Sequence, residues 1–426
     1  MPPIYESSED FAKRLDERDP LGKFRKRFAI PQGEEGEPLV YVNGNSLGLM
    51  PKVVRELVAQ ELDDWATLAV DAHFGGKTPW FSYHEVFRES GARLVGAHPG
   101  EVVMMNGLTV NLHLMMTTFY RPQPSRYKIL IEDGAFPSDA YAAQTQLAVH
   151  GYDPHEGLFR IAPRAGEALL HTEDVVEAIE RYGSEIALVL LPGVQYYTGQ
   201  LLDIAAVTQA AHRAGCAIGW DLAHAAGNVP LKLHDWDVDF AVWCSYKYLN
   251  SGPGGIGGCF VHERHAANVR LPRLGGWWGN DPATRFRMHE ERSFVPRAGA
   301  DGWQLSNPPI LAMAPLRASL QIFDEAGMES LRRKSVVLTG YLEWLLNRAE
   351  SPRIEIITPK NSDERGCQLS LRLLDRQQET LNALQAAGIV GDHRPPDVLR
   401  VAPVPLYNTF HEVWRLARTL LDVGAA

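Results

Sequence analysis

The chain has 426 residues, of which 45% are hydrophobic and 22% are charged, and this length predicts two or three domains rather than a single hydrophobic core. Its formal net charge of −10 argues against nucleic acid or a membrane surface as a general partner. Residues 1–19 lack the apolar core of a signal peptide, and no stretch is apolar enough to span a bilayer.

The first predicted strand, residues 39–42, runs into a turn over residues 43–48 that is rich in Gly, Asn and Ser. Pro51 then opens a helix, because apolar residues follow it at helical spacing. Residues 71–80 form a loop that is too aromatic and basic for a plain linker, and we interpret this loop as a candidate part of an active site.

A strand over residues 101–105 ends directly before an apolar helix that begins near Thr109. The free amides of a helix start, together with the Thr109 hydroxyl, would make a seat for a phosphate group. An ordinary helix N-cap explains this segment equally well. Another buried strand, residues 127–131, precedes Phe136, whose ring could stack on a flat ligand at a further helix start.

Helix and strand patterns then alternate: a helix over 173–182, a strand over 186–191, a helix over 204–215 and a strand over 217–221. This alternation predicts an α/β fold with a mostly parallel sheet that is covered on both faces. The carboxyl ends of such strands are where ligands bind. We therefore predict a large cofactor-binding domain over residues 48–308.

Asp221 ends one of these strands, His224 follows it, and Lys247 comes at the end of the next apolar run, before a glycine-rich stretch. An amine held against apolar residues loses part of its hydration and can act as a nucleophile. A lysine that merely ends a strand with its head in water is the common alternative. The order of Asp, strand and Lys fits a pyridoxal phosphate site, in which the carboxylate keeps the ring nitrogen protonated and the lysine forms a Schiff base.

The pattern changes at Pro309. Helices are predicted over 316–323 and 329–347, strands over 354–357 and 368–373, a helix over 380–387, a strand over 398–402 and a last helix from 411. These elements predict a smaller α+β domain over residues 309–426, against which the N-terminal segment 1–47 packs.

Seven segments together resemble kynureninase, an enzyme of the fold type I pyridoxal phosphate class, the aspartate aminotransferase superfamily. They are residues 43–48, 106–113, 136–139, 197–200, 221–228, 243–258 and 399–408, and the similarity runs over nearly the whole chain. The Cys-Ser-Tyr-Lys-Tyr-Leu-Asn run around Lys247 is the most specific of these, with the Arg-Val-Ala-Pro-Val-Pro-Leu-Tyr-Asn run from Arg400. The resemblance implies a large domain with a mostly parallel sheet of the seven-stranded type.

The resemblance also assigns roles to residues. It makes Lys247 the lysine that holds pyridoxal 5'-phosphate, and Lys247, Tyr246 and Asp221 the catalytic residues. It implies cofactor contacts for Leu108, Thr109, Phe136, Pro137, Ser138, Asp139, Pro192, Asp221, His224, Tyr246 and Lys247, and, across a homodimer interface, for Trp277 and Asn307. Pro192 stands where a serine is expected, which removes any hydroxyl contact there.

Arg400, His73, Ser306 and Asn307 are the substrate-binding residues that the resemblance implies. Arg400 interrupts an apolar strand, where an unpaired guanidinium is costly, so a substrate carboxylate would pair it. If the resemblance is set aside, the alternative interpretations are a core aromatic for Trp277, a turn residue for Asn307 and a surface charge on a strand for Arg400. The resemblance implies that the substrate ring binds beside three polar residues, His73, Ser306 and Asn307. Their polarity predicts a preference for the 3-hydroxylated ring.

The implied activity is hydrolytic cleavage of the Cβ–Cγ bond of L-kynurenine or 3-hydroxy-L-kynurenine. The products are anthranilate or 3-hydroxyanthranilate and L-alanine. The enzyme would serve tryptophan catabolism or NAD biosynthesis as a cytoplasmic homodimer. Lys247 removes the Cα proton, water adds to the γ-carbonyl, and Tyr246 is the candidate donor of the proton that the β-carbon receives.

Two other functions are compatible with the pattern. A cysteine desulfurase needs a reactive cysteine on a mobile loop, but Cys367 leads into a strand, where a buried thiol is inert. A non-catalytic pyridoxal phosphate-binding protein would have lost Lys247 or Arg400, and this chain retains both. The four cysteines have no close pairs, which predicts a reduced protein without a zinc site.

Overall fold

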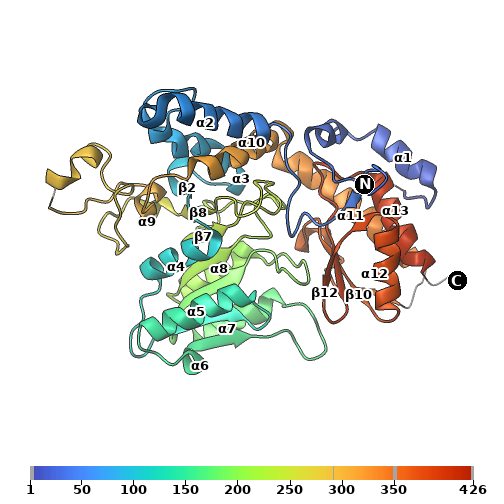
Figure 1. Ribbon diagram of the computed structural model, residues 1–426. Coiled ribbons are helices and arrows are strands. Elements are labelled where there is room, and N and C mark those ends of the chain that lie inside the picture. The colour runs from blue at the N-terminus through green and yellow to red at the C-terminus, as the bar shows by residue number, and fades with distance from the viewer. Residues whose placement is uncertain (1–3, 291, 349–352, 424–426) are drawn as a thin grey trace.

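A seven-stranded sheet forms the centre of the computed structural model, which describes residues 4–290, 292–348 and 353–423 (Figure 1). The strand order is β2-β8-β7-β6-β5-β3-β4, and all neighbouring pairs are parallel except those that β8 makes with β2 and β7. The bounds are β2 (Val102–Met104), β3 (Lys128–Glu132), β4 (Leu158–Ile161), β5 (Ile186–Pro192), β6 (Ala217–Asp221), β7 (Phe240–Trp243) and β8 (Gly258–Val261).

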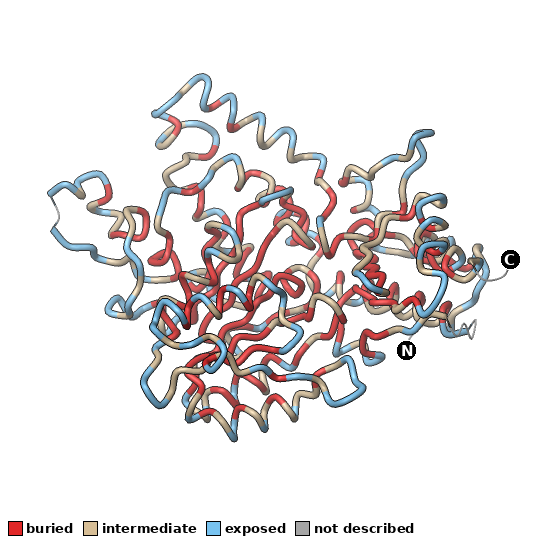
Figure 2. Tube along the Cα trace, turned by 60° about the horizontal axis from the view of Figure 1, so that its bottom comes forward, coloured by how far each residue is buried: buried red, intermediate tan, exposed pale blue. Residues whose placement is uncertain are grey.

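Helices cover both faces of this sheet, as the alternating pattern predicted. They are α2 (Val54–Leu68), α3 (Arg88–Val95), α4 (Leu108–Phe119), α5 (Pro137–Val149), α6 (Pro154–Gly157), α7 (Thr172–Tyr182), α8 (Ile204–Arg213), α9 (Glu263–Ala266) and α10 (Ile310–Ala326). Alternate strand residues enter two separate cores. Leu130 packs in the core that α7 and α8 share, whereas Ile129 and Ile131 pack in the core of α4 and α5. Figure 2 shows the buried residues concentrated along these strands.

A second, four-stranded sheet lies in the C-terminal part of the chain. Its order is β12-β13-β10-β9 and all its pairs are antiparallel, with β9 (Ile354–Ile356), β10 (Leu369–Leu373), β12 (Asp392–Arg394) and β13 (Val398–Val401). Its helices are α11 (Met328–Arg348), α12 (Gln377–Ala386) and α13 (Phe410–Asp422). Leu342, Leu371 and Leu416 belong to the core between this sheet and these helices.

The N-terminal segment packs on this C-terminal part (Figure 1). β1 (Val40–Tyr41) pairs in parallel with β11 (Ile389–Val390), and α1 (Glu9–Glu17) lies beside α13. The Asp16 carboxylate accepts hydrogen bonds from the backbone N–H groups of Phe410 and His411 at 2.6 and 3.0 Å. Asp16 therefore supplies acceptors to the free N–H groups at the start of α13.

The structure differs from the sequence prediction at several elements. The short strands β4, β11 and β12 were not predicted, and the predicted loop over residues 71–80 overlaps at its ends with two 3-10 helices, η2 (Ala69–His73) and η3 (Trp80–Phe87). α10 begins at Ile310, before the predicted start at residue 316, and continues through Pro315. Met313, Ala314 and Leu316 are fully buried, so tertiary packing outweighs the hydrogen bond that the proline removes. Within the described residues, none of the helices has the length and apolar character needed to cross a membrane.

Candidate active site

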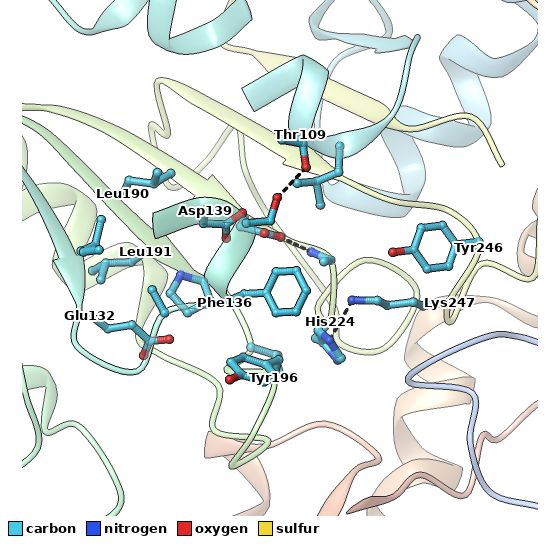
Figure 3. A pocket seen from close by; sticks show the side chains of 18 residues that line it. Thr109, Glu132, Phe136, Asp139, Leu190, Leu191, Tyr196, His224, Tyr246 and Lys247 are labelled. Atoms are coloured by element: carbon cyan, nitrogen blue, oxygen red, sulfur yellow. Dashed lines mark hydrogen bonds between the residues drawn. The ribbon is translucent and has the colours of Figure 1, made fainter. Parts of the chain in front are cut away.

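The carboxyl ends of β3, β5, β6 and β7 meet at one edge of the large sheet, around a hollow of about 670 Å³ that includes its open mouth (Figure 3). Ten residues that the sequence proposed for cofactor binding line this hollow: Leu108, Thr109, Phe136, Ser138, Asp139, Pro192, Asp221, His224, Tyr246 and Lys247. The topology of parallel strands explains the convergence, because loops from neighbouring strands open on the same edge.

Lys247 follows β7 and reaches into the hollow toward His224 (Figure 3). The Lys247 Nζ atom lies 2.9 Å from His224 Nε2. Burial lowers the pKa of His224 well below its usual value, and the positive charge of Lys247 lowers it further. His224 is therefore neutral and accepts a hydrogen bond from the lysine amine, while its Nδ1 atom is buried without a partner.

Two carboxylates lie on the floor of the hollow. Asp221 ends β6 and accepts a hydrogen bond of 2.6 Å from the Ala223 N–H, and Asp139 lies in the first turn of α5. Burial, and then the negative charge of Asp221, raise the pKa of Asp139 well above its usual range. One proton shared by this pair, or a cationic group beside it, relieves the repulsion. Asp139 Oδ1 is buried without a hydrogen-bond partner.

The starts of α4 and α5 face the same hollow. Their N-cap residues, Gly107 and Phe136, supply no side-chain hydrogen bond to the free N–H groups of the first turn. The Thr109 and Ser138 hydroxyls, one from each helix start, lie 3.0 Å apart. Two uncapped helix starts and two hydroxyls form an anion seat that suits a phosphate group.

These parts fit pyridoxal 5'-phosphate. The anion seat suits its phosphate, the pair of Asp139 and Asp221 suits its protonated ring nitrogen, and Lys247 is a primary amine for its aldehyde. The Phe136 ring is 43% exposed, and its centroid lies 5.9 Å from Lys247 Nζ, so an aromatic face borders the space between the amine and the seat.

The remaining proposed residues lie outside the hollow. Pro137 is the first residue of α5 and does not line the hollow. Trp277 packs against Trp278 with ring centroids 4.9 Å apart. The Ser306 hydroxyl donates to Asn307 Oδ1 at 3.2 Å, and His73 Nδ1 lies 3.0 Å from the Val70 carbonyl oxygen. Both contacts are on exposed parts of the chain.

Arg400 is also outside the lining, although it lies close behind it. Its side chain is 1% exposed, and its Nη1 atom donates to the carbonyl oxygen of Tyr196 at 2.6 Å. Its Nη2 atom is paired with Asp392. The guanidinium is therefore already paired before any substrate is present.

Glu132 and Tyr196 line the hollow but were not proposed from the sequence. Glu132 ends β3, is buried, and accepts a hydrogen bond of 3.1 Å from Gln195 Nε2. Burial raises the pKa of Glu132 to about 7. An acidic residue at the carboxyl end of a buried strand was the signal that would have identified it.

Cys367 does not resemble a catalytic thiol. It is 1% exposed, its backbone N–H donates to Asn228 Oδ1 at 2.9 Å, and burial raises the pKa of its thiol to about 12. A buried thiol with a raised pKa is a poor nucleophile, as the sequence led us to expect for this cysteine.

His98, Glu101 and His234 are the described residues whose composition resembles a metal site, with ligand atoms within 4.8 Å of one another. They lie at the opposite edge of the sheet, where β2 begins. The two imidazole rings stack with centroids 3.9 Å apart and planes at 18°, so their in-plane lone pairs do not converge on one ion. The Glu101 carboxylate already accepts hydrogen bonds from the backbone N–H groups of His98 and Glu263. We therefore assign no metal to this cluster.

The chain is similar to known proteins over almost its whole length. A family model described as the kynureninase C-terminal domain matches residues 331–420. A protein named kynureninase from Koribacter versatilis is 56% identical over 414 residues, which cover 97% of each chain. Another, from Myxococcus xanthus, is 55% identical over 419 residues and 98% of each chain.

Solved structures with the same fold are much less similar in sequence. The cysteine desulfurase CsdA from Escherichia coli superposes with a TM-score of 0.74 at 19% identity, covering 95% of this chain and 98% of its own. A mutant of C-DES with glycine covalently linked to its pyridoxal phosphate gives a TM-score of 0.74 at 18% identity, covering 90% and 96%. At such low identity the likeness concerns the fold alone, and it confirms the predicted fold type I class.

We predict that Glu132 makes the cofactor-free protein less stable as the pH rises. Its folded pKa of about 7 is above the usual 4.5, so its ionisation reduces stability progressively between these values. Relative to the wild type, Glu132→Gln should gain about 1–3 kcal/mol between pH 4.5 and pH 8. Urea unfolding across this range measures the gain, with the exposed Glu17→Gln as control. A difference that does not change with pH would contradict the prediction.

Proposed function

The chain belongs to the kynureninase family, and we propose that it hydrolyses the Cβ–Cγ bond of L-kynurenine, 3-hydroxy-L-kynurenine or both. The products are anthranilate or 3-hydroxyanthranilate and L-alanine, and pyridoxal 5'-phosphate is the cofactor. The observation that carries the proposal is the amine of Lys247 beside a neutral His224, in one hollow with the paired carboxylates Asp139 and Asp221. When bound, the cofactor withdraws electrons from the α- and β-carbons of the substrate.

Lys247 is the residue that we propose to move the Cα proton. Neutral His224 accepts a hydrogen bond from the Lys247 amine without adding a second positive charge. The contact orients the amine toward the hollow. Once the amine is deprotonated, its lone pair is free to accept the Cα proton.

Asp221 and Asp139 keep the floor of the hollow negative. Two buried carboxylates close together favour a cation beside them, so they hold a ring nitrogen in its protonated form. The uncapped start of α4, together with the Thr109 and Ser138 hydroxyls, would hold the anionic end of the cofactor. The opposite polarity of the two ends supports a single orientation for the bound group.

Tyr246 lines the hollow next to Lys247 and is our proposed acid. Burial raises the pKa of Tyr246 far above its usual value, so the phenol stays protonated at neutral pH. In the hydrolysis, water oxygen joins the γ-carbon, the Cβ–Cγ bond breaks, and the β-carbon takes a proton. A phenol that keeps its proton until a strongly basic carbon develops is suited to that last transfer.

Arg400 is our proposed partner for the α-carboxylate of the substrate, since a guanidinium pairs with a carboxylate through two parallel hydrogen bonds. It lies behind Tyr196, whose side chain borders the hollow. Substrate binding would then require a change in the contacts of Arg400.

A homodimer with shared active sites is part of the proposal. Phe74, Phe81 and Phe286 pack on one another with ring centroids 5.5–5.8 Å apart, and Phe74 and Phe286 are 66% and 57% exposed. An exposed aromatic cluster of this kind supports a protein interface, and twofold contacts are the commonest. We propose that Trp277 and Asn307 reach the partner's hollow from this side of the molecule.

We further propose that the enzyme acts in the cytoplasm, in tryptophan catabolism or NAD biosynthesis. All four cysteines are unpaired, which supports a reducing compartment. Both rival functions lose support: the thiol of Cys367 is buried, and Lys247 is present in the hollow.

Lys247→Ala protein should fold and retain pyridoxal phosphate through the anion seat, but it should lack the absorbance of the Schiff base and any detectable turnover. Anthranilate fluorescence after mixing with L-kynurenine measures the activity. Lys232→Ala, which changes an exposed lysine, is the matched control and should remain active. Normal turnover by Lys247→Ala would refute the assignment of this lysine.

The protein should sediment at about twice its chain mass of 47.4 kDa. Phe286→Asp places a charge in the aromatic cluster, so it should shift the protein toward the monomer and lower kcat/KM. Val149→Asp changes a more exposed apolar residue at the end of α5 and should leave the dimer intact. A monomer with full activity at assay concentration would rule out shared active sites.

We expect kcat/KM for 3-hydroxy-L-kynurenine to exceed that for L-kynurenine by tenfold or more. Polar groups at His73, Ser306 and Asn307 would be left unpaired by the unhydroxylated ring, at a cost of about 1–3 kcal/mol per group. Asn307→Ala should reduce the ratio. Equal values would support the alternative that Ser306 and Asn307 satisfy each other, as their hydrogen bond of 3.2 Å allows.

A further inference from the structure

The ion pair between Arg400 and Asp392 connects the inner strand β13 of the small sheet with its edge strand β12. β12 and β13 run antiparallel, and Asp392 lies directly opposite Arg400 in the register. Arg400 is fully buried, and Asp392 is 15% exposed. An arginine buried to this extent needs a counter-ion, because an unpaired charge in the interior is strongly unfavourable.

Asp392 has a second arginine partner. The Nη2 atom of Arg394, two residues further along β12, lies 3.1 Å from the same carboxylate oxygen that pairs with Arg400. Arg394 is 40% exposed and lies at the rim of the sheet, whereas Arg400 lies in the interior. One carboxylate is thus shared between a buried and a half-exposed guanidinium.

The pair adjoins the catalytic hollow. Arg400 Nη1 donates to the carbonyl oxygen of Tyr196, and Tyr196 lines the hollow. The positive charges of Arg400 and Arg394 both act on His224, the hydrogen-bond partner of Lys247. The Nε atom of Arg400 is buried without a partner, which leaves a donor available for a second anion.

We propose that Asp392 is a positioning residue that holds Arg400 until the α-carboxylate of the substrate replaces it, while Arg394 retains Asp392. The inference rests on the proposed function, which assigns the substrate carboxylate to Arg400. Each anion then has one arginine in the complex. No charge is left unpaired in the interior in either state, so the exchange avoids a large desolvation cost.

The exchange makes Asp392 a competitor of the substrate. The apparent affinity for a carboxylate ligand equals the intrinsic affinity multiplied by the fraction of molecules in which Arg400 is free of Asp392. Asp392→Asn leaves a side chain that can still accept a hydrogen bond from Arg400 but carries no charge, so it raises that fraction. Loss of the Arg394 guanidinium removes the alternative partner of Asp392 and lowers the fraction.

The test is a titration of the cofactor-loaded enzyme with L-alanine, followed by cofactor absorbance. Ethylamine, which has the amine without the carboxylate, is the ligand control. Asp392→Asn should bind L-alanine about three- to tenfold more tightly, and Arg394→Gln should bind it more weakly by a similar factor. Neither variant should change the binding of ethylamine. KM for L-kynurenine should move in the same directions, with kcat little changed.

Two further variants separate the exchange from a general change in charge. Asp397→Asn removes the same charge from the loop between β12 and β13, where Asp397 faces Arg372 rather than Arg400, and it should have little effect. In the double variant Asp392→Asn, Arg394→Gln, the weakening caused by Arg394→Gln should disappear, because it acts through Asp392.

Unchanged or weaker L-alanine binding by Asp392→Asn overturns the inference, as does an equal effect on ethylamine or an equal effect of Asp397→Asn. A wild type that shows no L-alanine binding, with none restored by Asp392→Asn, overturns it too. Thermal unfolding of each variant identifies any loss of folding. Failure of the proposed function is a separate result: the wild type then releases no anthranilate, whereas the L-alanine titration needs no cleavage.

Discussion

Burial of charge at one edge of the large sheet is the constraint on which the active site depends. Lys247, Asp139 and Asp221 meet in a hollow where water cannot fully hydrate them, and His224 avoids a further charge by staying neutral. Such a cluster is stable only when each charge faces a partner of opposite sign. Asp139 Oδ1 and His224 Nδ1 are buried without a hydrogen-bond partner, and in our proposal the cofactor would lie beside them.

The architecture could be predicted from the sequence because the relevant signals are local. Apolar strands that alternate with amphipathic helices predict a parallel sheet covered by helices. The end of the strand 217–221 can be located because the charged Asp221 follows an apolar run. The positions of Thr109, Phe136 and Lys247 follow, since each comes directly after a predicted strand or at a helix start. Topology then brings these residues together without further information.

Other features depend on contacts that no local pattern contains. The start of α10 before Pro315 follows from packing of Met313 and Leu316, and the pairing of Arg400 with Asp392 follows from strand register. Glu132 can be singled out in the sequence as an acidic residue at the end of a buried strand, but its raised pKa arises from burial and then from the charge of Asp221, which no local pattern contains. The proposed roles of Trp277 and Asn307 rest on the resemblance alone, because a single chain carries no signal for a residue that would serve a partner subunit.

The pairing of β1 with β11 and the contact of Asp16 with the start of α13 join the two ends of the chain. β1 and Asp16 are therefore synthesised long before the strand and the helix start that they contact. The sheet of residues 102–261 can assemble on the ribosome, whereas the opening segment must wait for the last helix to emerge. Until then β1 lacks the neighbours that bury Val40, so the order of synthesis sets when this part of the structure can form.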